Sequence, residues 1–511
     1  MSSVVSDQLS DRQKVVVLED KVQSLEHQLD WFKRQLFGRK SEKRLLEDHP
    51  NQPLLDGLVV ETQASSPSPE ETITYTRAKQ RGSDCVTDAG LRFDASVPKK
   101  IIRCSAPELE GPHAEDYEVI REQHTYRLAQ RPASYVVLEY VSPVLRHRPS
   151  RTLISPAAPP SLWAGSLADV SFVAGLLVEK FVYHQPLYRQ HQRLARDGIT
   201  LARGTLTNLA HRGISLLEPI YQAQLRSVLR SRILAIDETP IKAGREKKGK
   251  MRLAWYWPIY GQDDEVVFTY SRSRGHKHLV GTLGEFQGTI LSDGHSAYRR
   301  YAESVPGIVH AQCWTHTRRE FVKAEKAEPD AVAEALELIG VLYRIEAHIR
   351  EKRHDDKATL ACRAERAKPA VDTFFAWCDT QCQRLDLVPS NPLSKALKYA
   401  LKRQDALRLY LSDPQLQIDT NHLERTLRVI PMGRKSWLFN WTEIGAERVG
   451  FIQSLLTTCR LHDIHPTTYL IDVLQRISEH PDSRVDELIP RNWKRLFADN
   501  PLRSDLQLAQ D

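Results

Sequence analysis

Cysteine is scarce in this chain of 511 residues, which contains only seven. Their number is odd, they are scattered, and they form no CxxC pair, so neither a disulfide framework nor a structural zinc site is expected. Long apolar runs are also missing, because no stretch of about 18 apolar residues occurs that would predict a membrane span. The first residues lack the basic segment and apolar core of a signal peptide. We therefore expect a cytoplasmic protein with no membrane partner.

A strong excess of charge of one sign is absent as well. Lys and Arg number 72 and Asp and Glu number 65, a difference of 7, and the sequence pI is near 8.9. Such a mild basic excess permits a polyanion partner but does not demonstrate one. The hydrophobic content of 41% is ordinary for a globular protein, and the length suits roughly three or four domains.

Apolar residues with heptad spacing occupy the N-terminal segment. Seven of them between positions 15 and 36 alternate in steps of three and four, with charged residues between them. This pattern predicts a leucine-zipper-like coiled coil over residues 8–46 that forms a homo-oligomer through residues 15–36. The alternative is one amphipathic helix packed on its own domain. Arg39 and Lys40 follow in a basic run, which either contacts DNA phosphates or is simply a solvated face.

Two segments of different composition come next. Residues 47–97 are rich in Pro, Ser, Thr and Gln and are expected to be a linker. Residues 98–154 show alternating apolar positions, which predict a small antiparallel β-rich module. Cys85, Cys104 and His113 lack the paired spacing of a zinc site, so zinc is not expected here.

Residues 162–230 are expected to be helical. A helix, a short turn at Asp197-Gly198 and a second helix resemble a helix-turn-helix segment with many basic residues. The candidates for DNA contact are Arg193, Arg196 and Arg203. The alternative is an ordinary helical hairpin that packs beside the catalytic domain.

Five strand-like segments follow one another within residues 231–316. Their order predicts three antiparallel strands, with further strands added in parallel beside the first and alternating with helices. The first segment, ILAI at 233–236, is wholly apolar and runs into Asp237 and Glu238, and the fourth runs into Asp293. Carboxylates are costly to bury without a partner, so acids at the ends of buried strands indicate a metal site or a proton-transfer site.

A long helical stretch separates these acids from a third. Residues 317–416 carry helical patterns and predict an insertion, after which residues 417–445 return to the core and present Glu424 on a helix. The segment GRKSWLFNW at 433–441 is expected to be strand-like, and residues 446–511 to form a C-terminal helical region. The predicted fold class is therefore an α/β RNase H-like core, with a mixed five-stranded sheet and helices, that carries a large all-helical insertion.

The three acids suit the two-metal chemistry of RNase H-like nucleotidyl transferases. Two magnesium ions about 3.5–4 Å apart activate an attacking oxygen and stabilise a leaving one, and Mg²⁺ prefers oxygen ligands. Asp237 is the natural bridging ligand, with Asp293 on one ion and Glu424 on the other. The alternative for each acid is a structural carboxylate that caps a helix or forms an ion pair. Glu238 is expected to face the other way and to pair with a basic residue.

Basic residues near the acids are candidates for contact with DNA phosphates. On a helix, Arg428 shares the face of Glu424 and either holds this carboxylate or binds phosphate. For His316 and Arg319 the alternative is a packing role. The candidates in this group are His316, Arg319, Arg425, Arg428, Arg434 and Lys435.

Ordered motifs along most of the chain resemble the insertion sequence 66 family of bacterial DDE transposases. LEDKVQSLEHQLDWFKRQLFGRKSEK is similar to the leucine-zipper segment of that family, and KFVYHQPLYRQHQRLARDGITLARGTL to the start of its transposase domain. DETP, LSDGHSAY, CWTHTRREF and IDTNHLERTLR are similar to its catalytic blocks, and MGRKSWLF, SLLTTCRLHDIHPTTYL and DELIPRNW to its C-terminal blocks. The resemblance implies that Asp237, Asp293 and Glu424 are the DDE triad. It also implies two Mg²⁺ ions, with Mn²⁺ as a substitute, and DNA strand cleavage and transfer.

The sequence departs from the family pattern at three places. The family carries a cysteine-rich zinc-finger segment after the zipper, where only Cys85 and Cys104 stand in this chain. The usual Asp-Asn-Asn before the glutamate is Asp-Thr-Asn at 419–421, and the usual tyrosine after Asp-Gly is His295. None of these differences removes a carboxylate of the triad.

The expected function is that of an insertion-sequence transposase, acting as a homo-oligomer on double-stranded DNA at the element ends and the target. Accessory proteins of the same element and association with the bacterial nucleoid are further expectations. One alternative is a domesticated or inactive DNA-binding protein that keeps the fold without the chemistry. Another is an RNase H-like nuclease without strand transfer, although such a nuclease needs neither the zipper nor the DNA-binding helices.

Overall fold

The computed structural model describes residues 91–93, 97–104, 106–110, 113–131, 134–154, 161–248, 250–437 and 442–508. All of these residues belong to one compact unit, residues 84–511. The predicted coiled coil at 8–46, which includes Arg39 and Lys40, and nearly all of the predicted linker lie outside the described residues. Within the described ranges, no helix is both long enough and apolar enough to cross a membrane.

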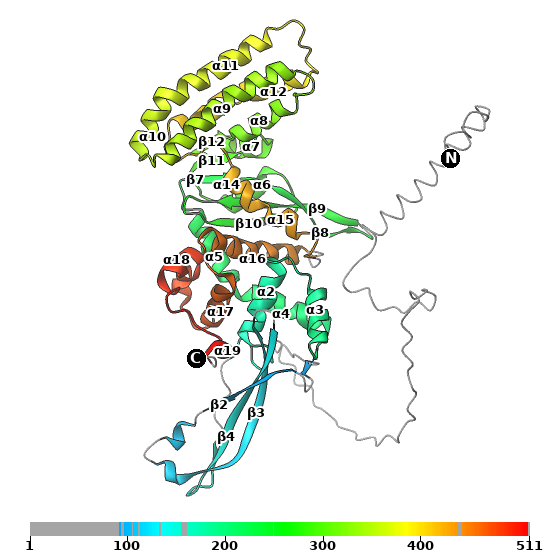
Figure 1. Ribbon diagram of the computed structural model, residues 1–511, viewed down its shortest axis with the longest axis vertical. Coiled ribbons are helices and arrows are strands. Elements are labelled where there is room, and N and C mark those ends of the chain that lie inside the picture. Colours follow the sequence, from blue (N-terminus) through cyan, green and yellow to red (C-terminus); the bar gives the residue numbers. More distant parts are fainter. Residues whose placement is uncertain are drawn as a thin grey trace, which may run out of the picture. The chain divides into compact units, whose positions relative to one another are not determined.

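Four strands form a small sheet near the start of the described chain (Figure 1). β3 and β4 make a long antiparallel hairpin, and β5 pairs antiparallel with β4. The expectation of a purely antiparallel module is wrong for β2, which runs parallel to β4. The chain reverses direction between β2 and β3 and again between β3 and β4, so β2 and β4 run the same way. Because β2 pairs with β4 and not with β3, this pairing is parallel. The strands are β2 (Lys99–Arg103), β3 (Tyr117–Arg131), β4 (Ser134–His147) and β5 (Leu153–Ile154).

Four helices follow the small sheet. α2 is buried along almost its whole length, and the Asp169 side chain caps it by accepting a hydrogen bond from the Ser171 backbone N–H at 2.8 Å. α3 and α4 are joined through Gly198, whose φ of 78° suits glycine, and through the short strand β6 (Ile199–Thr200). β6 pairs with β1 (Arg92–Phe93). The helices are α2 (Val170–Phe181), α3 (Leu187–Arg196), α4 (Arg203–Leu216) and α5 (Glu218–Val228).

A mixed sheet of six strands comes next, in the order β10-β9-β7-β11-β12 with β8 also paired to β9. β7, β9 and β10 are antiparallel neighbours, and β11 and β12 are added in parallel beside β7, as the sequence predicted. The first predicted strand is interrupted at Asp237 and Glu238, so β7 and β8 pair separately with β9. The elements are β7 (Ile233–Ile236), β8 (Thr239–Lys247), β9 (Lys250–Tyr260), β10 (Val266–Ser271), α6 (His276–Leu283), β11 (Gly288–Ser292), α7 (Ser296–Ser304) and β12 (Ile308–Gln312).

Residues 317–416 contain helices and no strand. α9 packs against α8 and α11, and α12 packs against the same two helices (Figure 1). A buried ion pair fixes the π-helical turn Arg363–Ala367 to α9, because Arg363 Nη2 lies 2.8 Å from Glu346 Oε2. The helices of this region are α8 (Trp314–Val322), α9 (Pro329–Glu351), α10 (Asp356–Cys362), α11 (Lys368–Cys382), α12 (Pro392–Leu401) and α13 (Gln404–Arg408).

The expected strand at 433–441 is wrong for its described part, where a helix ends at Gly433 and a turn follows. Trp437 is almost fully buried, and its Nε1 donates to the carbonyl oxygen of Lys180 at 3.0 Å. Its ring fills the space beside Gly433, where a Cβ would lie 2.0 Å away. The buried Trp437 side chain therefore holds the segment after Gly433 against α2. The C-terminal helices are α14 (Asn421–Leu427), α15 (Val429–Gly433), α16 (Glu443–Leu461), α17 (Pro466–Arg476), α18 (Pro490–Leu496) and α19 (Asp505–Leu508).

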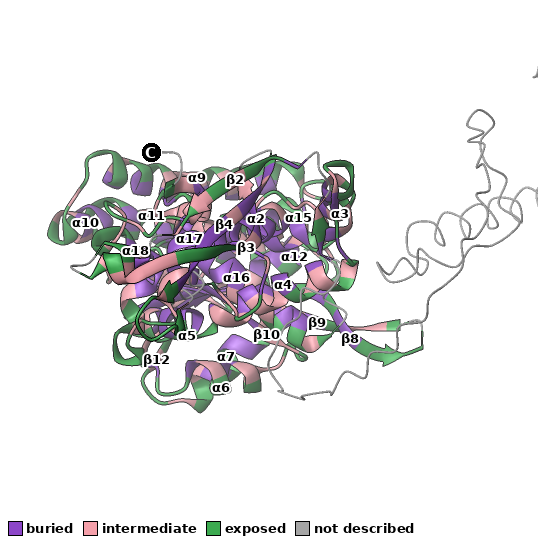
Figure 2. Cartoon of the chain, turned by 90° about the horizontal axis from the view of Figure 1, so that it is seen from below, coloured by how far each residue is buried: buried purple, intermediate pink, exposed green. Residues whose placement is uncertain are grey.

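Two apolar clusters pack helices against the sheet. α16 packs along β10, and α2, α4 and α16 carry many of the buried residues coloured purple in Figure 2. One apolar cluster includes Ala235 of β7 together with α2, α4, α16 and α17. A second cluster joins Ile233 and Leu291 of the sheet to the helices of residues 317–416. Both clusters therefore touch the face of β7 that carries its odd-numbered side chains.

Candidate active site

Asp237 and Asp293 lie side by side at the ends of two parallel strands. Ala235 of β7 is aligned with Leu291 of β11 in the hydrogen-bonding register. Each aspartate lies two residues beyond this pair, and side chains two positions apart point to the same face of a sheet. Neighbouring strands are about 4.8 Å apart, so the two carboxyl groups are neighbours. The strand ends predicted from the sequence therefore meet at one edge of the sheet.

Electrostatics shows that the Asp237 carboxyl is surrounded by other acids. Burial, followed by the charges of Glu238, Asp293 and Glu424, raises the pKa of Asp237 from 3.8 to about 7. The backbone N–H of Glu238 opposes this rise by donating to Asp237 Oδ1 at 2.8 Å. This one hydrogen bond does not offset burial and the nearby negative charges, so the pKa of Asp237 stays raised.

Other side chains hold Glu238 in place. Its carboxylate is 2% exposed and accepts a hydrogen bond from Arg274 Nε at 2.7 Å and another from the Tyr298 hydroxyl. The prediction that Glu238 pairs with a basic residue is thereby confirmed. Sequence reasoning did not single out Arg274 or Tyr298, because they follow different strands and no local spacing links either one to Glu238.

Glu424 is brought to the same edge by the segment that precedes α14. The carbonyl oxygen of Ile418 accepts from the Trp314 backbone N–H at 3.1 Å, and Thr420 donates through its N–H and its hydroxyl to Cys313 Sγ, each at 3.3 Å. Cys313 directly follows β12, the strand beside β11. These bonds fix the start of α14 next to the ends of the parallel strands.

The Glu424 carboxylate is paired with the basic residues that follow β12. Arg319 donates to Glu424 Oε2, and His316 Nε2 lies 3.7 Å from Glu424 Oε1. This oxygen is buried and has no hydrogen-bond partner in the described part of the chain. The sequence predicted His316 and Arg319 as phosphate contacts, and here both lie directly beside the third acid.

A divalent cation fits the residue types and charges at this edge. Three carboxylates supply the hard oxygen ligands that Mg²⁺ prefers, one oxygen of Glu424 is unsatisfied, and Asp237 is in a strongly negative surrounding. Among the described residues, however, no three His, Cys, Asp or Glu side chains are arranged to hold an ion. The ion pair between Glu424 and Arg319 explains part of this result, because Arg319 binds Glu424 Oε2, an oxygen that a metal ion would need.

The predicted DNA contacts of the helical segment differ in their surroundings. Arg193 binds within the chain, to the carboxylate of Glu179 and to the Tyr135 hydroxyl, which its Nη2 approaches to 2.7 Å. Arg196 is exposed, and the guanidinium of Arg203 lies 5.7 Å from the ring centroid of Tyr188. Contact of these arginines with DNA stays a prediction.

The predicted contacts around α14 and α15 are on the surface. Arg425, Arg428 and Lys435 are exposed. Arg434 is exposed as well, and its Nη1 donates to the carbonyl oxygen of Pro240 at 3.1 Å, three residues after Asp237. All four side chains are therefore accessible to a polyanion, and their contact with DNA stays a prediction.

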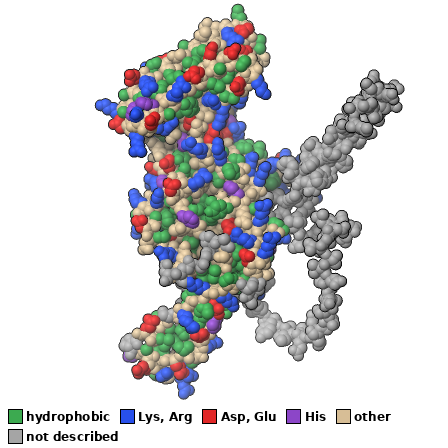
Figure 3. Space-filling view, in the orientation of Figure 1, with side chains coloured by type: hydrophobic (Ala, Val, Ile, Leu, Met, Phe, Trp, Pro, Cys, Tyr) green, Lys and Arg blue, Asp and Glu red, His purple; other side chains and the backbone are tan. Residues whose placement is uncertain are grey.

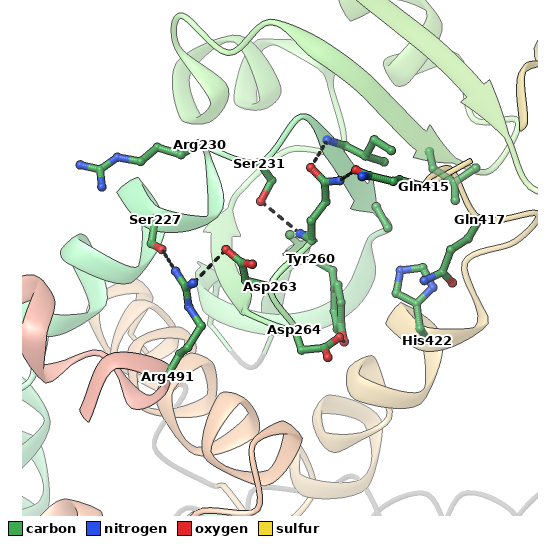
Figure 4. A pocket seen from close by; sticks show the side chains of 15 residues that line it. Ser227, Arg230, Ser231, Tyr260, Asp263, Asp264, Gln415, Gln417, His422 and Arg491 are labelled. Atoms are coloured by element: carbon green, nitrogen blue, oxygen red, sulfur yellow. Dashed lines mark hydrogen bonds and ion pairs between the residues drawn. The ribbon is translucent and has the colours of Figure 1, made fainter. Parts of the chain in front are cut away.

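A separate cavity of about 600 Å³ lies beside the beginning of β7 (Figure 4). Ala235 and His422 are among the residues that line it, but none of the three predicted acids is. Some of its polar groups bind one another, since Gln262 Nε2 donates to Gln415 Oε1 at 2.7 Å. The cavity shares the face of β7 with the acids without including their carboxylates.

A mixed α/β fold with acids gathered at the ends of adjacent strands is consistent with the catalytic domain of a transposase. The chain belongs to the transposase IS66 family, whose sequence model matches residues 165–448. The IS66 C-terminal element matches residues 454–491, and a family described as transposase C of IS166 homeodomain matches residues 24–91.

Curated relatives from Sinorhizobium fredii are described as uncharacterized proteins. The protein y4hP is 28% identical, with 93% of this chain and 89% of that protein covered. The protein y4jD is 30% identical, with 66% of this chain and 68% of that protein covered. These relatives extend the likeness along most of the chain but assign no reaction to it.

Proposed function

We propose that the protein is a DDE transposase with an RNase H-like core that binds the ends of its element and catalyses DNA strand cleavage and strand transfer. Asp237, Asp293 and Glu424 are its metal ligands. The observation that carries this proposal is the alignment of Asp237 and Asp293 on parallel strands, with Glu424 held beside them by the bonds at Cys313.

Two divalent ions, Mg²⁺ or Mn²⁺, would supply charge stabilisation for the attacking and leaving oxygens of a phosphodiester. The chain's part is to hold its carboxylates ionised and in place. Asp237 is suited to this only with cations nearby, because its pKa is raised to about 7 without them. Glu424 would become a metal ligand if a cation replaced Arg319 as the partner of its carboxylate. The guanidinium of Arg319 would then be available to a DNA phosphate.

The family match and the distribution of basic residues support DNA as the partner. The exposed residues Arg196, Arg425, Arg428 and Lys435 are proposed contacts to the phosphate backbone. Oligomerisation through residues 15–36 would bring two element ends together, as strand transfer requires. Accessory proteins of the same element are further proposed partners.

Strand transfer with a duplex taken from the DNA that flanks the gene tests the proposal. The variants Asp237→Asn, Asp293→Asn and Glu424→Gln keep the side-chain shape and remove the charge. Losing a metal ligand costs several kcal/mol of transition-state stabilisation, so each variant should be at least about 100-fold slower. Asp379→Asn, on the exposed surface of α11, is the matched control and should transfer normally. Normal transfer by any of the three triad variants would refute the triad.

One observation favours the alternative of a DNA-binding protein without chemistry. Glu424 is bound to Arg319, and the described residues contain no formed metal site. A protein that has lost its chemistry would bind end DNA but take up no Mn²⁺, whereas a transposase whose third ligand is exchangeable would take it up. Isothermal titration of Mn²⁺ into the protein–DNA complex separates these two functions.

A further inference from the structure

A second cavity, of about 300 Å³, lies beside the second predicted metal ligand. Gly294, the residue after Asp293, forms part of its wall. Ser296 and Arg299 of α7 line one part, and Lys402 and Arg403, between α12 and α13, line another. The cavity therefore lies where the sheet edge that carries the acids meets the helices of residues 317–416.

The lining of this cavity is basic. Arg299, Lys402 and Arg403 contribute three positive charges, and Asp405 contributes one negative charge. Arg299 is exposed and has only a weak neighbour, since its Nε lies 3.7 Å from Glu303 Oε1 in a solvent-accessible pair. In the described part of the chain, neither Lys402 nor Arg403 forms an ion pair with a carboxylate. The cavity thus has a net positive charge that the chain itself does not neutralise.

Arg403 is fixed as part of the wall. Its Nη2 donates to the carbonyl oxygen of Gly294 at 3.1 Å, its Nη1 donates to the carbonyl oxygen of Tyr399 at 3.0 Å, and its guanidinium lies 3.6 Å from the Tyr399 ring centroid. A Cβ at Gly294 would come within 2.4 Å of the Tyr399 hydroxyl oxygen and 2.6 Å of Arg403 Nε. The helical region thereby fixes the position of the backbone directly after Asp293.

The geometry points to a phosphate-binding site: we propose that this cavity receives a backbone phosphate of the DNA strand that runs past Asp293. Lys402 and Arg299 contact the phosphate, and Arg403 is a positioning residue that holds Gly294 and adds its charge to the wall. Several blue Lys and Arg side chains in Figure 3 lie close beneath the helices of residues 317–416, near the same junction. The helical region then binds substrate as well as holding the catalytic edge in place.

This inference rests on the proposed function, since it takes DNA as the substrate. A free oxyanion such as inorganic phosphate shares the same chemistry. DNA is favoured because the cavity adjoins Asp293, and because Lys402 and Arg299 are exposed at its surface, where a long polyanion can reach them without entering a closed pocket.

The test is binding of end DNA by the full chain in EDTA, where strand chemistry is off, at several salt concentrations. The double variant Arg299→Ala/Lys402→Ala is compared with Arg300→Ala/Lys395→Ala, which removes the same charge from exposed positions on α7 and α12 outside the cavity. Losing one phosphate contact should reduce the slope of log K against log salt by about 0.9. The control pair should keep the wild-type slope. Equal slopes for the two pairs, or no change in either, would overturn the proposal.

Two further outcomes separate this proposal from the proposed function. If the triad variants cleave DNA normally but the cavity pair lowers the slope, the triad is wrong and the phosphate site stands. If the triad variants are inactive but the cavity pair binds like the wild type, the phosphate site is wrong and the transposase stands. Inorganic phosphate at matched ionic strength is the second probe. A thermal shift that depends on Arg299 and Lys402, with DNA binding unchanged, would assign the cavity to a free anion and overturn the DNA assignment.

Discussion

Replacing Asp237 by asparagine is expected to stabilise the metal-free protein at high pH while it abolishes strand transfer. The Asp237 carboxyl is crowded by Glu238, Asp293 and Glu424, and it accepts a hydrogen bond from the backbone N–H of Glu238. Asparagine has nearly the same shape, and its Oδ1 can keep this hydrogen bond. It carries no charge, so it escapes both the cost of burial and the repulsion.

The magnitude follows from the pKa of Asp237, which rises from 3.8 to about 7. A tenfold change in acidity corresponds to about 1.4 kcal/mol, so the ionised carboxylate costs the folded state roughly 4 kcal/mol. The folded-state pKa lies above the unfolded value. The stabilising contribution is therefore fully present below about pH 4 and is lost as the pH rises through about 7. The Asp237→Asn variant therefore gains little stability over the wild type at acidic pH and gains the full roughly 4 kcal/mol above pH 7.

The assay is thermal unfolding of the wild type and of Asp237→Asn in EDTA at about pH 5 and about pH 8. The difference in melting temperature in favour of the variant should grow from the lower to the higher pH. Added Mg²⁺ should raise the melting temperature of the wild type and leave that of the variant nearly unchanged, because ligand binding stabilises only the protein that binds. Asp379→Asn should match the wild type at both pH values. A variant that is equally or less stable than the wild type at pH 8 would show that the ionised Asp237 carboxylate does not destabilise the folded protein.

Three other predictions concern stability and assembly. Arg363→Met leaves the buried carboxylate of Glu346 without its partner and should lower the free energy of unfolding by about 3–5 kcal/mol in a denaturant titration, with a much smaller loss when Glu346→Gln is added. Gly450→Ala would place a Cβ 2.5 Å from a carbonyl oxygen of β10 and should cost about 1–3 kcal/mol, measured in the same way, whereas an unchanged midpoint would contradict the close packing of α16. Leu25→Lys/Leu29→Lys should lower the mass measured by light scattering, and an unchanged mass would argue against the coiled coil.

The central sheet was predictable because its signal is local. A short, wholly apolar run such as 233–236 predicts a buried strand. Acids that directly follow such a run then lie at the end of the strand. The register, however, depends on contacts between distant segments. Nothing in the sequence states that Ala235 aligns with Leu291, although this alignment is what brings Asp237 and Asp293 together.

The partners of the acids were the least predictable part of the site. Arg274 and Tyr298 hold Glu238, and Arg403 holds the backbone after Asp293, yet these residues are separated from their partners by 36, 60 and 109 positions. Such contacts arise from tertiary packing and leave no periodic signal. The expected strand at 433–441 was wrong in its described part, residues 433–437, for the same reason, because burial of Trp437 against α2 overrides the local strand pattern.

The central claim, that three acids of this chain hold divalent ions on DNA, is tested most directly by counting bound Mn²⁺. Electron paramagnetic resonance of the protein with end DNA measures the number of ions per chain in the wild type and in Asp237→Asn, Asp293→Asn and Glu424→Gln. We expect two ions in the wild type, the loss of both in Asp237→Asn because this residue would bridge them, and weaker binding of one ion in each of the other two variants. The same number of ions, bound equally tightly, in the wild type and in all three variants would contradict it.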